Sequence, residues 1–127
     1  MKNLPKLINL LAGVVLFTAN IIPLASPELI YHQAYQIEFT TPQSYTVLRT
    51  LSIVLAVMGF LWIWIAIKTT HQIQLLKATF VLVSAFVLGR VVGLLVDGFD
   101  QYLTYYELGF EFLSWLVVLV VLLKNRT

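Results

Sequence analysis

The chain has 127 residues, of which 60% are hydrophobic and only 11% are charged, and this composition excludes a soluble domain of its size. Its formal net charge of +2 is small and its basic residues are not clustered, which excludes a nucleic-acid-binding surface. The absence of cysteine excludes disulfides, thiolate nucleophiles and sulfur ligands for a metal. With a mean hydropathy of +0.90, the sequence predicts an integral membrane protein.

The first predicted membrane helix covers residues about 6–24. Its apolar run is long enough to cross the bilayer, because roughly 20 residues of helix span the hydrocarbon core of about 30 Å. A secretory signal peptide has the same order of charged and apolar regions, but no small-x-small cleavage site follows this run. Gly13 lies at helical spacing with Asn9, Leu16 and Asn20. This stripe predicts helix packing and interhelical hydrogen bonds, with ligand contact as the alternative.

A short interfacial helix is predicted over residues about 27–37. Ser26, Pro27 and Glu28 have the order of an N-cap, a proline at the first helical position and an acid in the first turn. The segment mixes aliphatic side chains with tyrosines and His32, as is typical of the membrane interface. The other histidine, His71, is predicted in the opposite loop, so the two cannot hold one metal or haem. No cofactor and no metal site are therefore expected.

The second predicted membrane helix covers residues about 42–68. Eighteen uncharged residues separate Arg49 from Lys68, which is roughly enough to cross the bilayer, so Arg49 is expected near the interface. Gly59 lies on one helical face with Ser52 and Ala56, below Arg49. Small side chains on that face predict close helix packing.

The third predicted membrane helix covers residues about 74–97 and carries one charge inside its span, Arg90. Residues 78–89 are too few to cross the hydrocarbon core, so Arg90 must lie inside the bilayer. A charge at that depth is unfavourable and requires a partner. Gly89 and Gly93 form a G-x-x-x-G pair around the arginine. That pair permits close packing, either within the chain or between two copies.

The fourth predicted membrane helix covers residues about 102–124. Gly98 is placed to end the preceding helix and Asp100 to cap this one, while Thr104 and Glu107 match a capping box at a second possible start. The twelve residues from 112 to 123 span only about 18 Å, so Glu111 must also lie inside the bilayer.

Four crossings place both termini on one side of the membrane, and the positive-inside rule predicts that this side is cytoplasmic. The basic residues on that side are Lys2, Lys6, Lys68, Lys77, Lys124 and Arg126. All six acids are expected towards the opposite face, namely Glu28, Glu38, Asp97, Asp100, Glu107 and Glu111. Arg49 and Arg90 are the two basic residues that accompany the acids.

Arg90 and Glu111 are predicted to meet, because Arg90 lies seven residues before Asp97 and Glu111 lies seven residues after Thr104, which is about 10 Å of helix in each case. An antiparallel pair of helices would bring them together, with Asp97, Glu107 and Arg49 above them. One interpretation is a buried ion pair that fixes the register of the helices. The other is an outward-facing polar pocket for an anionic headgroup, a fatty-acid carboxylate or another amphiphile, in which Arg90 and Arg49 contact the anion.

The arginine that opens the second helix, the G-R-x-x-G-x-x-x-D-G run at residues 89–98 and Glu111 resemble a family of small bacterial membrane proteins. This family is catalogued as domain of unknown function 4345. The resemblance implies four helices, a location in the bacterial inner membrane and no settled activity. It also implies that Arg49, Arg90, Asp97 and Glu111 form one constellation.

The sequence thus predicts a single domain with an all-α fold, a four-transmembrane-helix antiparallel bundle. We expect a non-enzymatic protein that binds a lipid or small amphiphile and affects membrane homeostasis or permeability. An oligomeric transporter or proton-coupled protein is one alternative, and four helices would then require a homo-oligomer. An accessory subunit that docks another membrane protein is a further alternative. An enzyme is least expected, because no serine, cysteine or metal triad is present.

Overall fold

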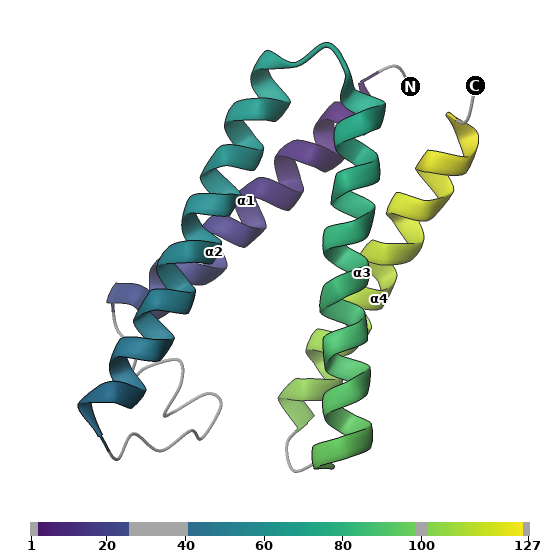
Figure 1. Ribbon diagram of the computed structural model, residues 1–127. Coiled ribbons are helices and arrows are strands. Elements are labelled where there is room, and N and C mark those ends of the chain that lie inside the picture. Colours follow the sequence, from purple (N-terminus) through teal and green to yellow (C-terminus); the bar gives the residue numbers. More distant parts are fainter. Residues whose placement is uncertain (1–2, 26–40, 99–101, 126–127) are drawn as a thin grey trace. The chain divides into compact units, whose positions relative to one another are not determined.

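The computed structural model describes residues 3–25, 41–98 and 102–125, and these residues form four helices (Figure 1). The helices are α1 (Leu4–Ala25), α2 (Pro42–Lys68), α3 (Gln72–Asp97) and α4 (Tyr102–Lys124). Each is long and apolar enough to cross a membrane. The predicted all-α fold with four transmembrane helices is therefore confirmed.

Some predicted features lie outside the described residues. They are the interfacial helix at 27–37 with His32, and the cap at Asp100. The described contacts fall into two compact units, Leu10–Lys68 and Met1–Asn9 together with Thr69–Thr127. The single-domain organisation stays a prediction.

Helix α3 ends where the sequence places a glycine. Gly98 follows the last helical residue, Asp97, and has a φ of 81°. Side chains other than glycine rarely adopt this backbone conformation, so Gly98 terminates α3 as predicted. Pro5 is compatible with α1 because it lies in the first turn, where the backbone nitrogen has no partner within the helix. Pro23 lies inside the last turns of α1 and cannot donate the usual bond to the carbonyl of Ala19.

In the unit Leu10–Lys68, α1 and α2 cross at a pair of glycines. A Cβ atom built on Gly13 would lie 2.9 Å from the carbonyl oxygen of Gly59. A Cβ atom on Gly59 would lie 2.5 Å from the backbone nitrogen of Phe17. Both distances are too short for real contacts, so only glycine allows the two backbones to approach this closely. These short distances support the predicted role of Gly13 and Gly59 in helix packing.

We predict that Gly59→Ala destabilises the α1–α2 crossing, because the new methyl group would meet backbone atoms that cannot rotate away. The expected loss is about 1–3 kcal/mol in the free energy of unfolding, as for other overpacked sites. Equilibrium unfolding in detergent micelles measures this loss.

Gly89→Ala is the matched control, because a Cβ atom there meets no atom within 4 Å. The control is expected to be at least as stable as the wild type, because alanine is more favourable than glycine inside a helix. Equal unfolding free energies for Gly59→Ala and Gly89→Ala would contradict the tight crossing.

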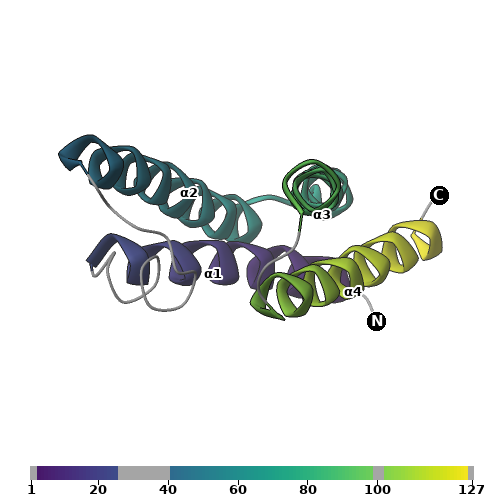
Figure 2. The same cartoon turned by 90° about the horizontal axis from the view of Figure 1, so that it is seen from below.

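In the other unit, α3 packs against α4, and both views show the two helices side by side (Figure 2). The core between them consists of Leu76 from α3 with Val118 and Val121 from α4. Phe80 packs against this core, and the centroid of its ring lies 5.6 Å from the ring centroid of Trp115. Most other apolar side chains of the two helices are exposed, as expected for surfaces that face lipid.

The start of α1 joins this unit through the fully buried side chain of Asn9. Its amide nitrogen donates to the backbone oxygen and to the side-chain oxygen of Gln72, at 3.1 and 3.0 Å. Its amide oxygen accepts a hydrogen bond of 2.9 Å from the hydroxyl of Thr79. A buried amide is tolerated in an apolar interior only when its hydrogen bonds are made, and here both amide ends have partners.

Candidate functional site

Three charged side chains of α3 and α4 meet between these two helices. The guanidinium of Arg90 forms an ion pair with Glu107 through Nη2. Its Nε donates to both carboxylate oxygens of Glu111, at 3.4 Å each. We call Arg90, Glu107 and Glu111 the Arg90 cluster.

Helix geometry explains why both glutamates reach one arginine. Glu107 and Glu111 are four residues apart on α4, so they lie on one helical face, one turn from each other. Arg90 lies seven residues before the end of α3, which places it about 10 Å from that end. The structure brings Arg90 and Glu111 together as these depths predicted. The direct ion pair with Glu107 is a finding of the structure, since the sequence placed Glu107 above the pair.

The Arg90 cluster contains one cation and two carboxylates, so with all three groups ionised it carries one excess negative charge. Its side chains are partly exposed, by 31% for Arg90, 22% for Glu107 and 17% for Glu111. Two sides of the guanidinium already face carboxylates. The cluster is therefore better suited to a cation or a proton than to an anion.

A second polar contact between α3 and α4 lies close to the middle of both helices. The indole nitrogen of Trp115 donates a hydrogen bond of 2.8 Å to the hydroxyl of Ser84. Trp115 follows Glu107 and Glu111 at the same four-residue spacing, so the three polar groups share one face of α4. Neither Ser84 nor Trp115 was predicted from the sequence as a site residue, although the four-residue spacing is a signal that identifies Trp115.

Arg49 has a different environment from that of Arg90. Its Nη1 donates to the carbonyl oxygen of Leu24, near the end of α1, at 3.1 Å. Its side chain is exposed, and within the described ranges it forms no ion pair. Asp97, the last residue of α3, is likewise exposed and forms no ion pair with a described residue. That Arg49 and Asp97 join Arg90 in one constellation stays a prediction.

The glycines beside Arg90 do not lie against another helix in the described part of the α3–α4 unit. A Cβ atom on Gly89 or Gly93 would meet no atom within 4 Å. This differs from Gly13 and Gly59, which lie against backbone. Among the described residues no group of three or more histidine, aspartate or glutamate side chains is placed to hold a metal ion.

The arrangement can now be compared with known proteins. The sequence model of the family described as Domain of unknown function (DUF4345) matches residues 5–122, which is nearly the whole chain and includes the Arg90 cluster. The chain belongs to this family. No curated protein and no solved structure matches it. The DUF4345 chain is thus a multi-pass membrane protein with four membrane-spanning helices, and membership assigns it no activity.

We predict that Arg90→Met destabilises the DUF4345 chain, because it leaves two carboxylates without their cation inside the membrane. The expected loss is about 2 kcal/mol or more in the free energy of unfolding, measured in detergent micelles.

Arg49→Met is the matched control, because Arg49 contacts one carbonyl and no acid among the described residues. Its expected loss is smaller than that of Arg90→Met. Equal losses for the two variants would show that the Arg90 ion pairs do not stabilise the helix pair.

Proposed function

We propose that this chain is a non-enzymatic protein of the bacterial inner membrane that binds an amphiphile through an ammonium group at the Arg90 cluster. The observation that carries the proposal is the excess of one carboxylate over the single guanidinium inside the spanning helices. A net negative charge inside the spanning helices is unfavourable, so a ligand that brings a positive charge is stabilised there.

The proposed ligand group is cationic, whereas the sequence alone predicted that Arg90 contacts an anionic headgroup. Nε and Nη2 of Arg90 already face carboxylates, so an anion that approaches this guanidinium would be repelled by two negative charges. A cationic group instead adds to the cluster without breaking an ion pair. Arg49 has no acidic partner among the described residues and stays the candidate contact for an anion.

An amphiphile suits the surroundings of the cluster. The three charged side chains are partly exposed, so a headgroup can reach them from the side of the helix pair. Phe110 and Phe112, which flank Glu111 in the sequence, are 61% and 46% exposed. Exposed apolar side chains next to a polar group match a ligand that has an acyl chain and a polar head.

The proposed orientation follows from the lysines. If the four helices cross the membrane in alternate directions, the starts of α1 and α3 and the ends of α2 and α4 face one side. These helix ends carry Lys6, Lys77, Lys68 and Lys124, whereas the Arg90 cluster lies near the end of α3 and the start of α4. The positive-inside rule therefore supports cytoplasmic termini and an Arg90 cluster in the outer leaflet. A lipid-binding site in that leaflet is consistent with a role in membrane homeostasis or permeability.

We predict that Glu107→Gln lowers the retention of phosphatidylethanolamine during purification in a mild detergent. This variant removes the excess charge but keeps the pair of Arg90 with Glu111. The loss of one attractive charge is expected to reduce occupancy about fivefold. Lipidomics measures the ratio of phosphatidylethanolamine to phosphatidylglycerol in the purified protein.

Asp97→Asn is the matched control, since it also removes one carboxylate but lies outside the cluster. The control is expected to keep the wild-type lipid ratio. If Glu107→Gln keeps that ratio as well, the ammonium site is wrong.

A proton is the second candidate for the same excess charge. Glu107 and Glu111 share one guanidinium, so a proton on either carboxylate would make the cluster neutral. This favours the alternative of a proton-coupled protein, which with four helices per chain requires an oligomer.

The proton-coupled function predicts that Glu111→Gln abolishes proton flux into proteoliposomes that contain a pH-sensitive dye, because the variant cannot bind and release the proton. Asp97→Asn again serves as the control and is expected to keep the flux. A folded Glu111→Gln protein with unchanged flux would exclude this function, and the lipid measurement would be unaffected by that outcome.

A further inference from the structure

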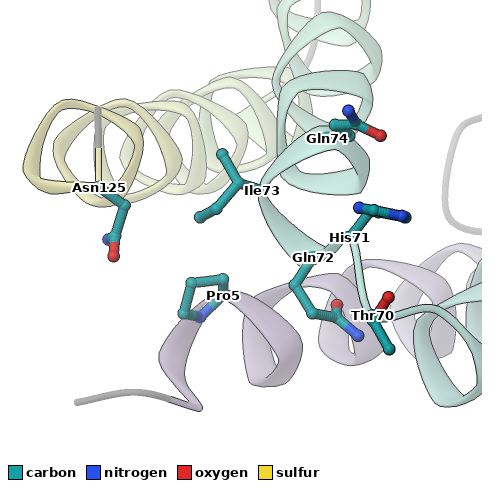
Figure 3. Close-up of a pocket in the computed structure, with 7 residues that line it drawn as sticks. All are labelled: Pro5, Thr70, His71, Gln72, Ile73, Gln74 and Asn125. Carbon is teal, nitrogen blue, oxygen red and sulfur yellow. The ribbon is translucent and has the colours of Figure 1, made fainter. Parts of the chain in front are cut away.

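A polar hollow lies at the end of the α3–α4 unit that is remote from the Arg90 cluster (Figure 3). Its volume is about 460 Å³. Its wall is formed by the first turn of α1, the segment that leads into α3, the first turn of α3 and the residue after α4. The lining residues are Pro5, Thr70, His71, Gln72, Ile73, Gln74 and Asn125.

The surroundings of this hollow carry positive charge only. Lys6 and Lys124 adjoin the lining residues Pro5 and Asn125 in the sequence, and Lys77 lies one helical turn after Ile73. All three lysines are exposed. Residues 3–25, 69–96 and 112–125 contain no aspartate or glutamate. An anion in the hollow therefore meets no opposing carboxylate from these segments.

The lining also supplies hydrogen-bond donors. Thr70, His71 and Gln74 are exposed, and within the described part of the chain no hydrogen bond engages their side chains. A hydroxyl, an imidazole and an amide all donate to phosphate oxygens. Gln72 and Asn125 are different, because their amides already bond Thr69 and Val121 within the protein. The donors at Thr70, His71 and Gln74 are thus available to a ligand.

We propose that this hollow binds the phosphodiester headgroup of an anionic phospholipid in the leaflet that contacts the ends of α1, α3 and α4. The hollow lies where these helices begin or end, which is the depth of lipid headgroups in a bilayer. Lysines near helix ends are expected from topology alone, but a hollow lined by a hydroxyl, an imidazole and an amide gives them a defined ligand position. Basic pockets between transmembrane helices bind anionic headgroups in this way.

The test compares Gln74→Glu with Gln74→Lys in the full chain. The probes are phosphatidylglycerol and phosphatidylcholine with identical acyl chains, mixed in detergent micelles, and native mass spectrometry measures the bound lipid. One added charge of either sign is expected to change phosphatidylglycerol occupancy about fivefold, downward for glutamate and upward for lysine. A folding defect would instead lower binding in both variants.

Gln43→Glu is the matched control, because Gln43 is an exposed glutamine in the first turn of α2. Both glutamate variants gain the same favourable interaction with a helix dipole, so folding is preserved in each. The control is expected to bind phosphatidylglycerol like the wild type.

Three outcomes would overturn the proposal. The first is equal phosphatidylglycerol binding by wild type, Gln74→Glu and Gln74→Lys, and the second is an equal loss in Gln43→Glu. The third is displacement of phosphatidylglycerol by millimolar inorganic phosphate, which would assign the hollow to soluble phosphate compounds. None of these outcomes concerns the Arg90 cluster, whose proposed ligand is defined by an ammonium group.

Discussion

The α3–α4 unit depends on one contact inside its membrane-spanning helices, in which two carboxylates pair with the same guanidinium. Arg90 cannot avoid the hydrocarbon region, and the same holds for Glu111, because the uncharged stretches beside them are too short to cross it. Each therefore needs the other. The contact joins the two helices near the end of α3 and the start of α4, and the hydrogen bond from Trp115 to Ser84 adds a second polar contact closer to the middle of the helices.

The helices of the two units are held together by different interactions. In the unit Leu10–Lys68, glycines at positions 13 and 59 let the backbones of α1 and α2 touch. In the other unit, larger apolar side chains pack around Leu76, and polar contacts lie on either side of this core. Close packing and hydrogen bonding replace the hydrophobic effect, which gives no net attraction between apolar helices in lipid.

The two proposed lipid-binding sites of the α3–α4 unit differ in the sign of the charge around them. The Arg90 cluster has an excess of negative charge, whereas the hollow at the other end of the same unit is surrounded by lysines. The first favours an ammonium group and the second a phosphodiester. Ammonium and phosphodiester groups are both carried by ordinary membrane phospholipids, so the two proposals agree on lipid headgroups as the ligands.

The sequence alone determined four helices and the depth of Arg90 and Glu111, because helix rise and bilayer thickness leave few possibilities for so apolar a chain. It also determined the end of α3, since Gly98 is the residue that adopts a positive φ there. Only the tertiary structure decided that Glu107 joins the ion pair and that Asn9 bonds Thr79. It also decided that Gly13 and Gly59, and not the pair at 89 and 93, lie against backbone among the described residues. Periodicity assigns a residue to a face of its helix, but the rotation and register of the packed partner decide what that face touches.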